Sequence, residues 1–418
     1  MSERNQGTGF AVALGAITLT GPLTIHLFLP AMPDVKAAFD APDAIVQLTF
    51  SVTLIAMAVV TPIYGSLSDR YGRRPILLGG LALFLVGSFL SALAGSILAL
   101  IAGRLVQATG AACGLTLARA IARDAYGPAA LVKAIAYLTM AYTLGPMVAP
   151  AAGGVLIDDF GWRSAFWFAL VVGSLIAVAA YGVLGETHKR AASAGASDGV
   201  LRHYAILLRD LRFVAFILQS GCMSFMFFAV AAASPFLMKD LLGRTATEYG
   251  LYFMCFPLGY CSGNLISSRL SGRVAIEKMV LAGSLVCLGA VTAQAGLILS
   301  GLLTPLIIFV PGGLMSFAQG LALPNAQAGA MRIRPELAGT AAGLGVFLQM
   351  LLSAASAQLY GVLADGTPRP MIWISSLGIV LAVGAAVYSF ANPGSEMANS
   401  GEAAPVPQPA IAKVASDV

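Results

Sequence analysis

Long apolar stretches alternate with short polar ones along almost the whole chain. Each apolar stretch is about 20 residues or longer, which is the length that a helix needs to cross a bilayer. A helix in lipid satisfies its own backbone hydrogen bonds, and these stretches lack the alternation typical of a membrane β-barrel. The pattern therefore predicts an all-α membrane protein. The twelve predicted transmembrane helices are residues 9–30, 45–65, 75–94, 98–118, 132–156, 164–184, 212–236, 246–267, 279–300, 303–330, 338–363 and 371–391.

The longest polar interruption before the C-terminal tail separates six predicted spans from six. We therefore expect two six-helix bundles that are joined by a cytoplasmic linker. The tail is rich in Ala, Pro and Ser, a composition typical of disorder. The predicted division is 1–184 for the N-terminal bundle, 185–211 for the linker, 212–392 for the C-terminal bundle and 393–418 for a disordered cytoplasmic tail.

Composition excludes a soluble globular protein. Hydrophobic residues make up 58% of the chain and charged residues only 10%, whereas a soluble domain carries about 25% charged residues. The net charge of +5 does not indicate a nucleic-acid partner, because the basic residues lie in short clusters between apolar runs. The five cysteines lie inside apolar runs without CxxC spacing, so we interpret them as packing residues.

The distribution of Lys and Arg predicts the orientation in the membrane. With the N-terminus inside, 18 of the 24 basic residues fall on the cytoplasmic side, five fall outside, and Arg104 lies within a span. Cytoplasmic loops of membrane proteins carry the excess of positive charge. We therefore expect a multi-pass protein of the cytoplasmic (inner) membrane with both termini in the cytoplasm.

A glycine- and arginine-containing segment connects the second and third predicted spans. Residues 65–74 read G-S-L-S-D-R-Y-G-R-R. The glycines permit close approach and a tight turn, and an Asp at a helix end can pair with an Arg or with a neighbouring helix N-terminus. The segment resembles the GxLxDRxGRR signature of the major facilitator superfamily. This resemblance implies a gating loop made of Gly65, Asp69, Arg70, Gly72 and Arg73.

Two further segments resemble motifs of the same superfamily. Residues 104–110, R-L-V-Q-A-T-G, are similar to its RxxQGxG pattern, with Ala108 at a position where Gly is usual. Residues 145–154 look like the GPxxGPxxGG motif of its antiporters, with Ala149 in place of Gly. Repeated Gly and Pro bend a membrane helix and let a neighbour pack closely. The antiporter-like residues are Gly145, Pro146, Pro150, Gly153 and Gly154.

A narrower resemblance covers about residues 10–390. Residues 22–33, the run from Arg119 to Asp124, and residues 323–326 with 339–341 are similar to the bicyclomycin/chloramphenicol-resistance (Bcr/CflA) branch. That branch consists of drug:proton antiporters with twelve spans, so the resemblance implies proton-coupled efflux of drug-like or amphipathic molecules. Members of the branch often carry Asp and Tyr where this chain has His26 and Phe28.

No carboxylate lies in the middle of a predicted span, which restricts the groups that can carry a coupling proton. Histidine changes its charge near neutral pH, so His26 is the first candidate. The full set of candidate proton-coupling residues is His26, Arg104, Asp34 and Asp124. Polar and aromatic residues inside spans could line a substrate cavity, and the candidates are Tyr142, Phe225, Asn325 and Gln349.

Two alternatives to an exporter remain open. A membrane enzyme would need clustered His, Asp or Glu residues, but only one His lies in a span. An uptake symporter for a small metabolite is opposed by the antiporter-like motif, although one fold supports many functions. The chain has no GxxxxGK[ST] loop for ATP hydrolysis. We expect a monomer that requires no cofactor or metal and binds a small molecule, protons and the lipid bilayer.

The first prediction tests the topology. In a chain whose native cysteines are replaced, a membrane-impermeant maleimide added to intact cells should label a cysteine at residue 36. It should label a cysteine at residue 200 only after the cells are permeabilised. Labelling of both positions from the same side would contradict the predicted topology.

Overall fold

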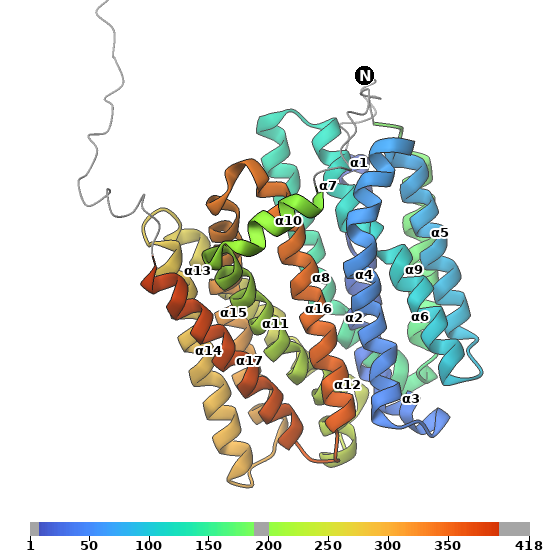
Figure 1. The fold of residues 1–418 in the computed structure, drawn as a ribbon. Coiled ribbons are helices and arrows are strands. Elements are labelled where there is room, and N and C mark those ends of the chain that lie inside the picture. The colour runs from blue at the N-terminus through green and yellow to red at the C-terminus, as the bar shows by residue number, and fades with distance from the viewer. Residues whose placement is uncertain (1–7, 188–199, 393–418) are drawn as a thin grey trace, which may run out of the picture.

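The computed structural model of the protein describes residues 8–187 and 200–392, and within these ranges every regular element is helical (Figure 1). The predicted tail 393–418 and residues 188–199 of the predicted linker lie outside the described residues. The domain boundaries given above stay a prediction. Among the described residues, eleven helices are long and apolar enough to cross a membrane.

The helices before the linker form one bundle (bundle A), coloured blue to teal in Figure 1. Its elements are α1 (Thr8–Thr18), α2 (Thr20–His26), the short η2 (Leu29–Ala31), α3 (Met32–Phe39), α4 (Asp43–Tyr71), α5 (Arg73–Ala92), α6 (Ile97–Ala111), α7 (Cys113–Ala125), α8 (Pro128–Phe160) and α9 (Ser164–Val183).

The helices after the linker form a second bundle (bundle B), coloured yellow-green to red. Its elements are α11 (Leu211–Phe236), the π-helical η3 (Leu237–Leu241), α12 (Ala246–Phe253), α13 (Cys255–Leu270), α14 (Ile276–Leu299), α15 (Pro305–Ile333), the short η4 (Pro335–Leu337), α16 (Ala338–Leu363) and α17 (Arg369–Ala391). The connecting helix α10 (Val200–Arg209) runs across one end of bundle B, and we call this end of the molecule the α10 face and the opposite end the α3 face.

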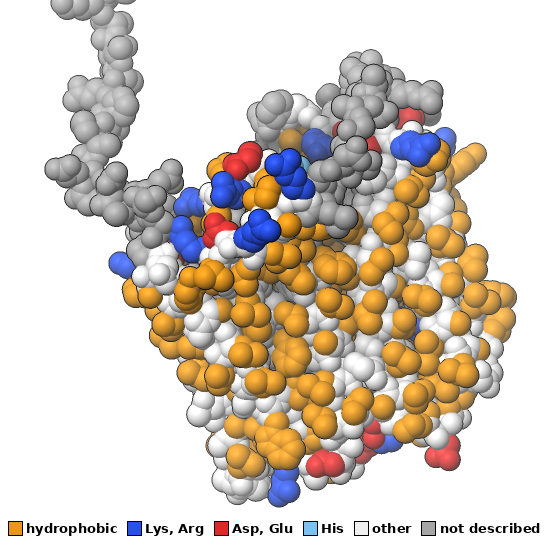
Figure 2. All heavy atoms as spheres, in the orientation of Figure 1, with side chains coloured by type: hydrophobic (Ala, Val, Ile, Leu, Met, Phe, Trp, Pro, Cys, Tyr) orange, Lys and Arg blue, Asp and Glu red, His pale blue; other side chains and the backbone are white. Residues whose placement is uncertain are grey.

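The surface has the banding of a membrane protein. Figure 2 shows hydrophobic side chains around the middle of the molecule, with Lys and Arg gathered towards the α10 face and a few charges at the α3 face. Large apolar side chains such as Leu98 and Val178 are more than two-thirds exposed, which lipid tolerates and water would not. The prediction of an all-α membrane protein is confirmed.

The predicted eighth span is not one continuous helix. Residues 246–267 were expected to form a single helix, but α12 ends at Phe253 and α13 begins at Cys255. The physical reason is Pro257, which has no N–H to donate to the carbonyl of Phe253 four residues earlier. The count of twelve continuous spans is therefore not confirmed. The first span is interrupted in the same way, because Pro22 and Pro30 lie within Thr8–Phe39.

Glycine positions allow neighbouring helices to pack closely against one another. A Cβ atom at Gly80 of α5 would lie 2.7 Å from Sγ of Cys113 in α7 and 3.1 Å from the hydroxyl of Tyr64 in α4. The adjacent Gly79 has nothing within 4 Å of the same position. Small residues at helix contacts are the usual means of close packing in membranes.

This pair gives the second prediction. Gly80→Val should destabilise bundle A by about 1–3 kcal/mol, because the added methyl groups overpack the contact with Cys113. Gly79→Val is the matched control, since it adds the same atoms at a neighbouring position that faces open space. Thermal unfolding of the purified protein in detergent should show a lower Tm for the first variant only. Equal Tm values would mean that α5 is not packed as described.

Candidate functional site

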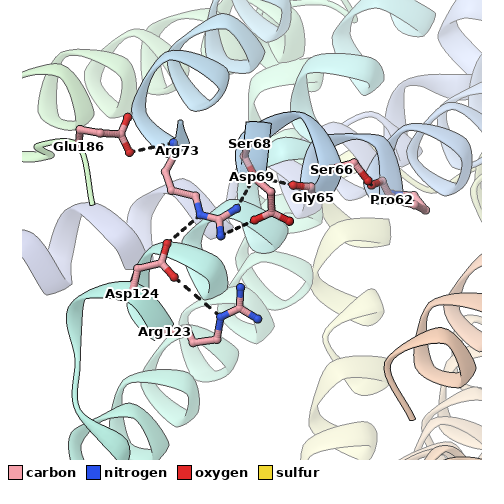
Figure 3. A network of polar contacts seen from close by, with 9 residues as sticks. All are labelled: Pro62, Gly65, Ser66, Ser68, Asp69, Arg73, Arg123, Asp124 and Glu186. Atoms are coloured by element: carbon pink, nitrogen blue, oxygen red, sulfur yellow. Dashed lines mark hydrogen bonds and ion pairs between the residues drawn. The ribbon is translucent and has the colours of Figure 1, made fainter. Parts of the chain in front are cut away.

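A buried arginine organises the α10 face of bundle A (Figure 3). Arg73 is 3% exposed, and its guanidinium lies 2.6 Å from the carboxylate of Asp69 and 2.8 Å from that of Asp124. It also donates to the hydroxyl of Ser68 at 2.6 Å. A buried guanidinium needs such partners, since an unpaired charge inside a protein is costly. The network joins the end of α4, the start of α5 and the end of α7.

The predicted gating loop is largely helical, which corrects the interpretation from sequence. Gly65, Asp69 and Arg70 belong to the last turns of α4, because its hydrogen-bond ladder continues beyond the apolar run. Only Gly72 leaves the helical conformation, with φ of +98°, a value that favours glycine. Gly65 makes no close approach, since nothing lies within 4 Å of a Cβ placed there.

A third carboxylate supports this turn. Glu186, which follows α9, accepts hydrogen bonds from the backbone N–H groups of Arg73 and Arg74 at 3.0 and 3.2 Å. It thus satisfies two of the free N–H groups at the start of α5 and places a negative charge at the positive end of that helix. The candidate gating residues are all in bundle A, and Glu186 lies directly after its last helix.

The described hydrogen bonds and ion pair that join the two bundles lie towards the α3 face. Lys239 of η3 forms an ion pair with Asp34 of α3. Deeper in the contact, the amide of Gln47 donates to the carbonyl of Ala232 at 3.0 Å. Gln358 of α16 accepts from Ser51 at 2.8 Å and donates to the carbonyl of Ala44 at 3.0 Å.

Asp158, near the end of α8, makes the most directional of these contacts. Its carboxylate accepts hydrogen bonds from the backbone N–H groups of Ala246 and Thr247, at 3.1 and 2.8 Å. These N–H groups begin α12 of bundle B and have no partner within their own helix. A helix N-terminus is partly positive, so the carboxylate of one bundle binds the end of a helix in the other. We call this contact the Asp158 latch.

The glycines of the antiporter-like segment allow α8 to contact other elements of bundle A and also α12 of bundle B. Gly145 lies against the ring of Pro22, and Gly153 lies against the carbonyl of Leu27, both in bundle A. Gly154 lies against the backbone of Ala246 at the start of α12. Pro146 and Pro150 are inside the helix, which continues from Pro128 to Phe160. A side chain at Gly154 would therefore push α8 away from the start of α12 and prevent the hydrogen bonds of the Asp158 latch.

Arg104 is enclosed in bundle A and is 1% exposed. Its guanidinium donates to the carbonyl of Thr24 at 2.8 Å, to the carbonyl of Thr49 at 3.3 Å and to the side chain of Gln107 at 2.7 Å. The ring of Phe28 lies 4.6 Å from the guanidinium carbon, and an aromatic face attracts a cation. Arg104 therefore faces the bundle interior. Within the described residues no carboxylate is within ion-pair distance of it, and backbone carbonyl groups are among its hydrogen-bond partners.

The four candidate proton-coupling residues are not brought together. The imidazole of His26 lies 5.8 Å, centroid to centroid, from the ring of Phe253 in α12, and its buried Nδ1 has no hydrogen-bond partner among the described residues. Asp34 is in the ion pair at the α3 face, Asp124 is in the Arg73 network, and Arg104 is held by the contacts above. The described contacts therefore give His26 a neighbour in bundle B rather than Arg104.

The four candidate cavity residues also lie in different surroundings. Tyr142 of α8 lies against Gly21 of α2 in bundle A. Gln349 donates to Ser224 at 2.8 Å and accepts from Gln327 at 3.3 Å. Asn325 donates to Ser267 at 2.7 Å. Phe225 packs against Gly378 of α17, a contact within bundle B.

Sequence reasoning did not identify the residues that join the bundles. In the sequence, Asp158 and Lys239 stand only as charges just after the ends of predicted spans. Gln47, near the start of an apolar run, carried a usable signal, since a buried amide in a span must find a partner. The position of its partner, 185 residues later in the chain, could not be inferred from the sequence.

The chain is similar to transport proteins along almost its whole length. A family model described as Major Facilitator Superfamily matches residues 12–357. "Uncharacterized MFS-type transporter YdgK" of Bacillus subtilis is 30% identical over 91% of this chain and 94% of its own length. "Bicyclomycin resistance protein homolog" of Haemophilus influenzae is 24% identical over 92% and 96%. "Multidrug resistance protein D" of Escherichia coli is 26% identical over 91% and 94%.

Solved structures show the same fold. A bacterial homolog of the human lysosomal transporter Spinster, inward-facing and unoccupied, superposes with a TM-score of 0.73 at 17% identity, over 91% of this chain and 95% of that one. A D-xylose-proton symporter superposes with a TM-score of 0.72 at 14% identity, over 91% and 97%. The resemblance predicted from the motifs is thus confirmed.

The Asp158 latch gives the third prediction. Asp158→Asn removes the charge and one of two accepting oxygens, which should shift the equilibrium away from contact at the α3 face by about fivefold, or about 1 kcal/mol. Spin labels at positions 93 and 302, in chains whose native cysteines are replaced, report the separation of the bundles at this face. The distance distribution should gain a longer component in Asp158→Asn and not in the neighbouring control Asp159→Asn. Identical distributions would show that the latch does not hold the bundles together.

Proposed function

Because the chain belongs to the major facilitator superfamily, we propose that it is a secondary active transporter that exports drug-like or amphipathic small molecules in exchange for protons. The relatives named for bicyclomycin and multidrug resistance support export. The proposed mechanism is alternating access, in which the two bundles rock about a substrate site between them. The transporter acts as a monomer and catalyses no covalent chemistry.

The observation that carries this proposal is the asymmetry of the contacts at the two faces. At the α3 face, Asp34, Gln47 and Asp158 of bundle A contact bundle B directly. At the α10 face, Asp69 and Asp124 pair with Arg73 inside bundle A. This arrangement fits a transporter that is closed at the α3 face. In the opposite state, these carboxylates at the α10 face become available to hold bundle B.

The orientation follows from the charge distribution. We infer that the α10 face, which gathers most of the Lys and Arg side chains, is cytoplasmic, and that both termini lie on that side. The state described is then inward-facing. The gating residues Gly65, Asp69, Arg70, Gly72 and Arg73 act in the other state, in which they hold the cytoplasmic side closed.

We further propose that His26 carries the coupling proton. Its unpaired Nδ1 and its contact with Phe253 of the other bundle support this role, because separation of α12 from α2 changes the surroundings of the imidazole. A coupling group must differ in proton affinity between the two states, and a change of neighbours provides the difference. Asp34 and Asp124 are the alternatives. Alternating access would break the pair of Asp34 with Lys239, which joins the bundles, whereas Asp124 pairs with Arg73 inside bundle A.

Inverted membrane vesicles test the proposed function. When respiration imposes a proton gradient, an exporter moves a lipophilic dye into inverted vesicles. In a second assay, adding the dye to de-energised inverted vesicles collapses a pH gradient that has been applied across their membrane. Proton-coupled uptake, the alternative function, predicts accumulation of substrate in right-side-out vesicles instead. Accumulation only in right-side-out vesicles would overturn the export proposal.

The fourth prediction concerns His26. His26→Ala should keep substrate binding but lose pH-driven transport by at least about tenfold, because no proton can then be exchanged for substrate. His26→Asp should restore part of the transport, as Asp is frequent at this position in the Bcr/CflA branch. His203 on α10 lies outside the spans, so His203→Ala is the control. A normal rate and pH profile in His26→Ala would move the role to Asp34 or Asp124.

A further inference from the structure

Helix α7 carries an arginine that the network at the α10 face does not use. The buried side of α7 consists of Cys113, Leu117 and Ile121 with the small residues between them. Thr116 and Arg119 lie on its other side, and Arg119 is exposed. The side chain makes one long contact, 3.5 Å, to the hydroxyl of Thr139 in α8. Within the described residues no carboxylate lies within ion-pair distance of Arg119.

Arg119 directly follows the predicted fourth span and lies within α7 rather than at its end. It precedes Asp124, which belongs to the Arg73 network, by five residues, or about 7.5 Å along the helix. A charge next to the hydrocarbon region is costly unless water or a partner reaches it. Its contact with Thr139 directs the guanidinium towards α8.

Two tyrosines from different bundles lie on the helices next to Arg119. Tyr142 is three residues after Thr139, the partner of Arg119, so both lie on the same side of α8. Helix α13 of bundle B, which carries Tyr260, packs against α8. Both tyrosines are partly exposed, and Tyr142 is within electrostatic range of Arg119 and of Tyr260. The three side chains therefore come from both bundles.

The carboxylates discussed above are bound by other groups. Asp69 and Asp124 are held by Arg73 at the α10 face, and Asp34 and Asp158 are bound at the α3 face. A cation beside Arg119 therefore meets an unpaired positive charge, and the carboxylate of Asp124 on the same helix is already held by Arg73. An anion meets a guanidinium with free donors and two phenolic hydroxyls, which also donate hydrogen bonds.

We propose that Arg119, Tyr142 and Tyr260 form a substrate subsite that binds the carboxylate of an amphipathic organic anion. The guanidinium donates hydrogen bonds to the carboxylate and neutralises its charge. The hydroxyls of the tyrosines donate to the remaining lone pairs, and the tyrosine rings contact the apolar body of the substrate. This inference rests on the proposed transport function but specifies its substrate class.

Three probes with one ring and different charges test the subsite. They are 1-naphthylacetate, its neutral amide 1-naphthylacetamide, and the cation 1-naphthylmethylammonium. Equilibrium binding to the purified full chain in nanodiscs should favour the acid over the amide by about tenfold, with the cation binding most weakly. Equal or tighter binding of the cation, or failure of the acid to bind, would overturn the proposal.

Substitutions then assign the preference to residues. Arg119→Gln should abolish the preference for the acid, Arg119→Lys should keep part of it, and Tyr142→Phe and Tyr260→Phe should each reduce it. Arg202→Gln, on the surface of α10, is the control that keeps the full preference. Gel filtration and Tm identify any variant that fails to fold. If Arg119→Gln fails to fold, the preference of Arg119→Lys for the acid decides. A preserved preference in Arg119→Gln would overturn the assignment.

The experiments distinguish failure of the subsite proposal from failure of the export proposal. If inverted vesicles show no export of any probe while acid binding depends on Arg119, the subsite stands and the export proposal falls. If export of the neutral amide is normal while the wild-type chain shows no preference for the acid, the export proposal stands and the subsite falls.

Discussion

The structure depends on where the contacts between the two bundles lie. Within bundle A, Gly110 lets the backbones of α5 and α6 meet. Between the bundles, the hydrogen bonds and the ion pair lie towards the α3 face, together with close approaches such as that of Gly250 to the backbone of Pro150. Each such hydrogen bond contributes about 1 kcal/mol. Two bodies whose described polar contacts lie at one face can separate there and close at the other.

The hydrogen bonds and the ion pair between the bundles depend on geometry. The Asp158 latch requires the end of α8 and the start of α12 to meet within hydrogen-bond distance, and Gly154 permits that approach. The pair of Lys239 and Asp34 lies at the same face. Because each contact stabilises only one arrangement of the bundles, together they bias the equilibrium without fixing it. A ligand or a proton can then shift the population by a comparable free energy.

Charges inside the membrane are treated in three ways in this chain. Arg73 is neutralised by carboxylates, and Arg104 is enclosed by carbonyl groups and an aromatic ring. These two arginines stabilise bundle A and are not available to a substrate. Arg119 alone among the three has neither kind of enclosure, and it contacts Thr139 of α8, the helix whose Gly154 and Asp158 meet bundle B. His26 contacts Phe253 of the opposite bundle. The positions that we propose for substrate and proton therefore lie on or beside helices that contact the other bundle.

The sequence by itself determined the membrane location, the helical class and the family. These follow from the length of the apolar runs and from the motifs at 65–74, 104–110 and 145–154, which are local patterns. Tertiary structure decided the rest. The break between α12 and α13 could have been inferred from Pro257, but the helical state of Asp69 could not, because the hydrogen-bond ladder continues past the end of the apolar run. The partners of Gln47, Asp158 and Arg119 lie in other helices, and only the packing of those helices brings them together.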